Sequence, residues 1–145
     1  MKSKILILMF IAISSVSLAQ KRISWDDLAK VTFDEKYFSE FDEYFLYPNF
    51  SVSVKALRHQ KVTISGYFLD VDPENNLYIL SKAPMASCFF CGVGGPETAI
   101  ELQFKTKPTF KMDDIVKITG TLELNRDDIY HFNYILKECE GTIEN

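Results

Sequence analysis

Apolar and polar residues alternate with a period of two along most of the chain after Ser51, which is the pattern of half-buried β-strands. The alternation starts at Val52 and Val54 and is interrupted by a polar turn at 58–60. Farther on it predicts strands over 61–71, 77–82, 99–104, 115–124 and 129–137. Turns rich in Asp, Asn and Pro separate several of these segments, so each apolar run is short enough to be one strand.

Two of the predicted strands are long and carry a glycine in the middle, Gly66 and Gly120. A glycine inside a strand marks a bulge or a sharp bend, and a strand that serves both sheets of a small barrel needs such a bend. We therefore predict a mainly β fold, a five-stranded OB-like β-barrel over residues 51–145. An open β-sandwich is the alternative that the same strands allow.

Residues 20–50 are predicted to form a short N-terminal helical, aromatic-rich extension. Ser24 is placed to cap a helical turn that includes Trp25 and Leu28, and the Trp25 side chain is expected to anchor this turn to the barrel. Aromatic side chains recur every four residues farther along, which predicts a second helix over 34–44. The expected role of the extension is to cover an open end of the barrel, and a ligand-binding face is the alternative.

Residues 1–19 have the features of an export signal. Lys2 and Lys4 precede an apolar run, and small residues follow, with expected cleavage between Ala19 and Gln20. The run is about 12 residues long and therefore too short to cross a bilayer. We expect a protein that is periplasmic or secreted and soluble after signal cleavage, without a membrane span.

Removal of the signal takes away two lysines and no acidic residue, which leaves 14 basic and 20 acidic side chains, a net charge of −6. Such a surface repels phosphate backbones, so nucleic acid is not an expected partner. An exported chain meets an oxidising compartment, and its three cysteines are an odd number. At least one of them is therefore unpaired, metal-bound or paired with another molecule.

The candidate chemistry lies in a Cys-x-x-Cys-Gly sequence formed by Cys88, Cys91 and the glycine that follows. Two residues between cysteines allow both thiolates to reach one ion, and zinc and copper(I) are the metals that such thiolates bind. Further ligands would have to come from elsewhere. The candidates are Cys139, His59, His131 and Glu97. Both histidines are expected to be surface side chains instead, His131 because its strand parity is opposite to that of the inward aromatic residues.

Three interpretations of Cys88 and Cys91 remain open. The first is a metal site, and the second is a local disulfide that staples the loop of a structural or interaction module. The third is a redox-active dithiol. It is the weakest, because the segment from Gly92 to Pro96 cannot extend the helix whose N-terminus normally activates a redox thiol. No Ser/His/Asp set, phosphate loop or paired-carboxylate motif is present, so we expect a non-enzymatic protein.

Several segments together resemble an exported domain-of-unknown-function family of Gram-negative bacteria. The likeness covers residues 23–104 and rests on Ser-Trp-Asp-Asp-Leu at 24–28, Pro-Asn-Phe at 48–50, a strand that ends in Gly-Tyr at 66–67, Leu-Ser at 80–81 and the cysteine-bearing loop. Similar proteins are often encoded beside ABC-type permeases. The resemblance implies an envelope or transporter partner and a link to metal supply. In this chain, Cys-x-x-Cys-Gly stands where the family has a single-cysteine, proline-rich loop.

Overall fold

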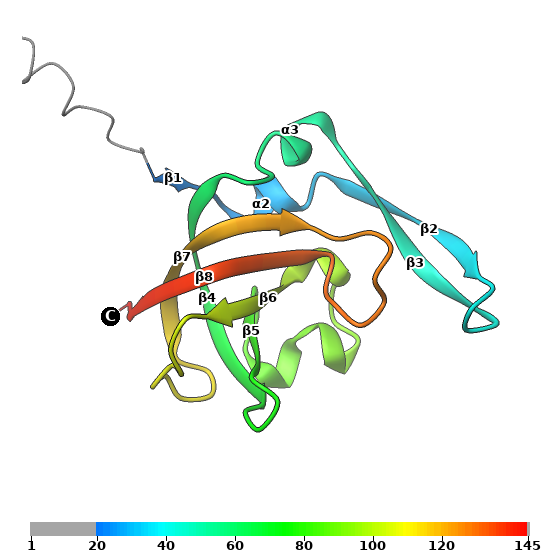
Figure 1. Ribbon diagram of the computed structural model, residues 1–145. Helices are drawn as coiled ribbons and strands as arrows, with labels where there is room; N and C mark the ends of the chain where they lie inside the picture. Colours follow the sequence, from blue (N-terminus) through cyan, green and yellow to red (C-terminus); the bar gives the residue numbers. More distant parts are fainter. Residues whose placement is uncertain (1–19, 145) are drawn as a thin grey trace, which may run out of the picture.

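The long strands β4 (Lys61–Asp72) and β7 (Ile115–Leu124) form the framework of the fold in the computed structural model (Figure 1). The structure describes residues 20–144, apart from the side chain of Phe90, so the predicted signal at 1–19 lies outside the described residues. β4 pairs antiparallel with β7 over Lys61–Tyr67 and with β5 (Leu77–Ser81) from Tyr67 onward. One continuous strand thus serves two neighbours in succession.

The sheet closes on itself. Its strand order is β4-β5-β6-β8-β7, and the β4–β7 pairing completes the circle, with β6 at Ala99–Phe104 and β8 at Tyr134–Ile143. β6 and β8 are parallel, whereas the other pairs within the ring are antiparallel. A short strand, β1 (Lys21–Arg22), adds to β4 in parallel. The predicted five-stranded OB-like barrel is confirmed.

Both mid-strand glycines lie where another backbone comes close, and Gly120 also lies at a register shift. Gly66 lies where β4 passes from its β7 partner to its β5 partner, and a Cβ atom there would stand 2.7 Å from the Ser81 carbonyl oxygen. Gly120 lies in a register shift between β7 and β8, where a Cβ atom would stand 2.8 Å from the Lys137 carbonyl oxygen. Only glycine allows these close backbone approaches without a rearrangement.

The first turn of the extension docks as predicted. Ser24 caps helix α2 (Trp25–Leu28), and its side chain and that of Asp27 form a reciprocal capping box. The Trp25 indole donates a hydrogen bond of 2.9 Å to the Ser65 carbonyl, and Leu28 is fully buried. Trp25 is therefore an anchor of this turn on the barrel.

A β-hairpin replaces the helix predicted over 34–44, and that prediction was wrong. Strands β2 (Val31–Phe38) and β3 (Glu43–Phe50) form a separate two-stranded sheet that projects from the barrel (Figure 1). Four-residue spacing is also an even spacing, so it keeps aromatic residues on one face of a strand as well as of a helix. Aromatic residues favour strands, and the rings of Tyr37 and Tyr44 pair across the hairpin at 5.2 Å.

Two further boundaries differ from the prediction. The residues after Ser51 form helix α3 (Val52–Lys55), because the Ser51 hydroxyl accepts a hydrogen bond from the Val54 N–H as an N-cap. β8 starts at Tyr134, not at 129, so Tyr130 is exposed where an inward position was expected. The side chain of Asn125 causes this shift, since its amide donates to the carbonyls of residues 128, 131 and 132 and holds 125–133 as a loop.

The core fills the inside of the barrel. Its buried members come from the ring strands and also from both ends of the 20–50 segment, where Ile23, Leu28 and Phe50 contribute. A second, smaller cluster lies apart from this core and contains Leu69 and Ile79. In the part of the chain that the structure describes, no helix has the length and apolar character needed to cross a membrane.

Candidate functional site

The cysteine loop, residues 82–98, connects β5 to β6. It is built from three single 3₁₀ turns, η1 (Met85–Ser87), η2 (Phe89–Cys91) and η3 (Pro96–Thr98). Gly92 ends η2 with a left-handed φ of 77°. A longer helix therefore does not start at the cysteines, as the sequence predicts.

The two cysteines of the loop differ in environment. Cys88 is 2% exposed and packs in the smaller cluster with Leu69 and Ile79, whereas Cys91 is exposed. The Cys88 sulfur lies 3.9 Å from the Met85 thioether sulfur. The Cys91 thiol donates a hydrogen bond of 3.2 Å to the Met85 carbonyl. Met85 thus contacts both cysteines, Cys88 through its thioether sulfur and Cys91 through its backbone carbonyl.

Desolvation raises the pKa of the Cys91 thiol above its ordinary value, and hydrogen bonding and charge repulsion from Cys88 raise it further. Cys88 and Cys91 both contact Met85, the first through the thioether sulfur and the second through the backbone carbonyl, so the two thiols share a neighbour. Both are free thiols in the structure, as is Cys139.

The other predicted ligands do not join the cysteine loop. Cys139 is buried in the main core, where its thiol donates to the Leu136 carbonyl and burial raises its pKa to about 12. The His59 ring lies 2.8 Å from a Glu123 oxygen in an exposed turn, as expected of a surface histidine. Among residues 20–144, no group of three or more His, Cys, Asp or Glu side chains is placed to hold one metal ion.

The remaining candidates have other neighbours. Burial raises the pKa of the Tyr134 hydroxyl, and the negative charge of the Glu97 carboxylate raises it further. His131 is partly exposed, as predicted, and its Nδ1 atom lies 2.9 Å from the carboxylate of Glu101. Glu101 is 6% exposed and also accepts a hydrogen bond of 3.2 Å from the Phe132 N–H. This pairing was not predicted from the sequence, although an acidic residue within the apolar run 99–104 is a visible signal for it.

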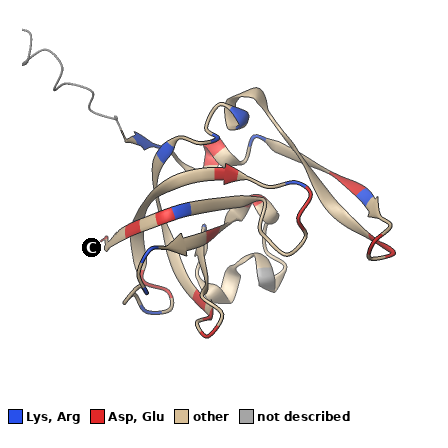
Figure 2. Cartoon of the chain, in the orientation of Figure 1, with Lys and Arg blue, Asp and Glu red and all other residues tan. Residues whose placement is uncertain are grey.

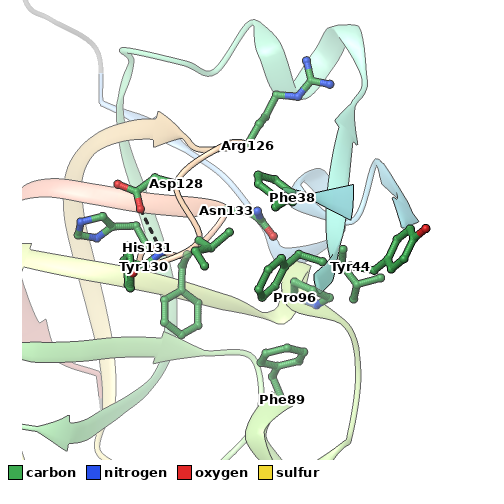
Figure 3. Close-up of a pocket in the computed structure, with 13 residues that line it drawn as sticks. Phe38, Tyr44, Phe89, Pro96, Arg126, Asp128, Tyr130, His131 and Asn133 are labelled. Carbon is green, nitrogen blue, oxygen red and sulfur yellow. Dashed lines mark hydrogen bonds between the residues drawn. The ribbon is translucent and has the colours of Figure 1, made fainter. Parts of the chain in front are cut away.

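A cleft of about 430 Å³ lies between the hairpin, the loop at 125–133 and the cysteine loop. Phe38 approaches it from the hairpin and Phe89 from the cysteine loop, while Tyr130 and His131 belong to the third wall (Figure 3). Strand periodicity carries no signal for a cleft of this kind, since its three walls are distant in sequence.

Polar contacts hold the hairpin against the 125–133 loop. The Asp127 carboxylate accepts hydrogen bonds from the Lys36 ammonium at 3.2 Å and from the Tyr47 hydroxyl at 3.1 Å. Lys36 and the guanidinium group of Arg126 also lie over the Tyr47 ring, 4.0 and 4.5 Å from its centroid. Phe41 adds an edge-on ring contact with Tyr130. These contacts fix the width of the cleft.

Comparison of the chain with protein-family models, with curated proteins and with solved structures finds no match.

Proposed function

We propose that the chain is an exported, non-enzymatic β-barrel module that binds a soft metal ion, copper(I) in preference to zinc, through Cys88 and Cys91. The observation that supports this most directly is the Met85 thioether sulfur, 3.9 Å from the Cys88 sulfur. Thiolate and thioether donors together favour copper(I). Structural zinc sites take four ligands, and among the described residues no third His, Cys, Asp or Glu is placed to hold one ion together with Cys88 and Cys91.

The exposure of the two thiols determines how an ion would reach the site. Cys91 is exposed and Cys88 is buried, so an ion would meet Cys91 first and then Cys88. Both thiols must lose their protons to bind, and the pKa of Cys91 is raised. Because protons compete with the metal ion for the two sulfur atoms, the affinity for the ion is expected to rise with pH.

An anaerobic copper(I) titration of the reduced protein against a coloured copper(I) chelator tests this proposal. We expect one copper per chain in the wild type and none in the Cys88→Ser/Cys91→Ser double variant. Met85→Leu should weaken binding about tenfold, or ~1.4 kcal/mol, because it removes one soft donor and keeps an apolar side chain. Met112→Leu is the matched control, because Met112 is an exposed methionine outside the loop.

Copper binding that survives loss of both cysteines would refute the proposal. Zinc binding tighter than copper(I) binding at the same thiols would refute the choice of metal. An unchanged affinity in Met85→Leu would remove the thioether from the site.

The alternative function is that of a structural module whose Cys88 and Cys91 form a disulfide. The contact that both cysteines make with Met85 supports this alternative as well, because it holds the two thiols in one short segment. Mass measurement after thiol labelling of protein taken directly from cells separates the two. A bridged pair supports the staple, and two labelled thiols support the metal site. A redox role has less support, because the pKa of Cys91 is raised, whereas reactive thiols have lowered values.

The proposed setting of this module is an envelope or transport system. It rests on the signal-like residues 1–19 and on the family resemblance, in which permeases are encoded nearby. Secretion of a tagged full-length chain into the periplasm or the medium, with cleavage after Ala19, is the expected result. Retention of the uncleaved chain in the cytoplasm would refute it.

A further inference from the structure

The hairpin that borders the cleft leaves the outer edge of β3 without a strand partner in the described structure. The Ser51 N–H donates to the Lys30 carbonyl at 3.1 Å, which makes 30 and 51 a hydrogen-bonded pair. Along an antiparallel hairpin, hydrogen-bonded pairs alternate with pairs whose backbone groups point away from the partner strand. By this alternation the backbone groups of Tyr44, Leu46 and Pro48 point outward. Pro48 has no N–H to offer, whereas Tyr44 and Leu46 each present a donor and an acceptor.

This free edge borders the cleft. Tyr44, Phe45 and Leu46 all line it, although consecutive residues of a strand point to opposite faces. The edge of the strand, and not one face alone, therefore forms this wall. A chain that lies in the cleft would meet the outward donors and acceptors of β3 directly.

Apolar side chains surround the same edge. Tyr130 is 79% exposed, Tyr44 68% and Leu46 51%. Phe38 and Phe45 lie behind them in an edge-on pair with 5.6 Å between ring centroids. Exposed apolar groups gathered around a cleft mark a binding surface, and their rings fit alternate side chains of an extended peptide.

The charge of the hairpin indicates what kind of peptide fits. Residues 31–50 hold five acidic side chains and one basic side chain, Lys36, which is paired with Asp127 (Figure 2). Glu43 stands directly opposite Phe38 in the hairpin register, beside the cleft. The two charged residues that line the cleft, Arg126 and Asp128, have opposite signs, so the acidic hairpin beside it sets the net charge. Two copies of this hairpin would repel each other, whereas a peptide with Lys or Arg would be attracted.

We propose that the cleft binds an extended apolar peptide segment of a partner protein, that this segment carries Lys or Arg, and that it adds as a third strand to the Tyr44–Leu46 edge of β3. Backbone hydrogen bonds to β3 provide affinity, the aromatic cleft takes alternate side chains, and the acidic residues select a basic partner. The proposal does not depend on metal binding at the cysteine loop.

The probe is an array of blocked octapeptides with Val, Leu, Phe or Tyr at alternate positions and Lys between them, beside a matched array with Glu in place of Lys. Binding to the isotope-labelled protein is followed by NMR. We expect lysine peptides to bind and to slow amide hydrogen exchange at Tyr44 and Leu46. The amide of Phe45 faces β2 and serves as an internal control. Glutamate peptides should bind about tenfold more weakly.

Variants separate the backbone contribution from the side-chain contribution. Leu46→Pro removes one outward N–H, and Pro48 shows that β3 accepts proline at such a position. We expect it to weaken binding about tenfold and more than Leu46→Ala does. Ile143→Ala, at an equally exposed apolar side chain of β8, should leave binding unchanged. A second test leaves the protein unchanged and therefore holds even if Leu46→Pro disturbs the hairpin. A peptide that is N-methylated at the amides that face β3 should fail to bind the wild type.

Three results would overturn the proposal. The first is that no lysine peptide binds at a concentration of about 1 mM. The second is binding without protection of the Tyr44 and Leu46 amides, which would make the cleft a site for apolar groups alone. The third is protection of these amides that grows with protein concentration in the absence of peptide, which would make a second copy the occupant.

Discussion

Replacing Gly66 by alanine places a methyl group where β4, β5 and the Trp25 ring meet. The new Cβ atom would lie 2.7 Å from the Ser81 carbonyl oxygen and 3.0 Å from both the Leu80 side chain and the Trp25 ring. The Ser81 backbone is held by strand pairs on both sides, so it has little room to move. Overpacking of this kind costs about 1–3 kcal/mol.

The methyl group also displaces the Trp25 ring, whose indole N–H bonds the Ser65 carbonyl at 2.9 Å. Loss of that hydrogen bond adds about 1 kcal/mol. The free energy of unfolding should therefore fall by about 2–4 kcal/mol, a large part of the ~5–15 kcal/mol that holds a typical domain. For a domain of this size the melting temperature should fall by roughly 8–16 °C.

Urea unfolding of Gly66→Ala, followed by circular dichroism and by the fluorescence of the single tryptophan, measures this loss. Gly141→Ala is the matched control, because a Cβ atom there meets the ends of the Ile118 and Phe110 side chains, which can shift. We expect the control to cost less than about 1 kcal/mol. A Gly66→Ala variant within about 0.5 kcal/mol of the wild type, or a control that loses as much, would refute the close-approach argument.

Three other predictions concern single groups. Alkylation of Cys91 by iodoacetamide should reach its half-maximal rate at a pH above 9.0, because desolvation and Cys88 raise the pKa of this thiol, and a midpoint near neutrality would contradict this. Tyr134→Phe should lower the free energy of unfolding by about 1–2 kcal/mol in a urea titration, because the buried hydroxyl donates to the Leu28 carbonyl at 2.6 Å, and an unchanged stability would contradict it. Asp127→Asn should cost about 0.5 kcal/mol or less, since its ion pair with Lys36 is exposed to solvent. Lys36 also lowers the pKa of Asp127, so this contribution is present above the ordinary carboxyl pKa and is lost as the pH falls through the lowered value, which NMR titration of the wild type checks.

The barrel was predictable because its strands are half-buried, so apolar and polar residues must alternate along each of them. The segments 61–71 and 115–124 each show this alternation around a glycine, and the structure confirms both strands and a register shift at Gly120, whereas the register is regular at Gly66. The hairpin was not predictable from spacing, because an interval of four residues fits one face of a helix and one face of a strand. The late start of β8 depends on one side chain, Asn125, whose hydrogen bonds a pattern of apolar residues does not contain.

The candidate site was predictable in part. Spacing brought Cys88 and Cys91 together, and the same three-residue interval separates Met85 from Cys88, so the thioether was visible in the sequence as a soft donor. The burial of Cys88 was not visible, because it comes from packing against Leu69 and Ile79 of distant strands. The cleft could not be found at all, since its walls meet only in the folded chain.

The position of Cys139 in the barrel interior has a consequence for oxidation. A chain with an odd number of thiols risks joining the wrong two or linking to a neighbouring molecule. Here the third thiol is enclosed by the main core, whereas Cys88 lies in the smaller cluster and Cys91 is exposed. Once the barrel has closed, an oxidant can reach Cys91 but not Cys139, so folding before oxidation protects the chain from mispairing.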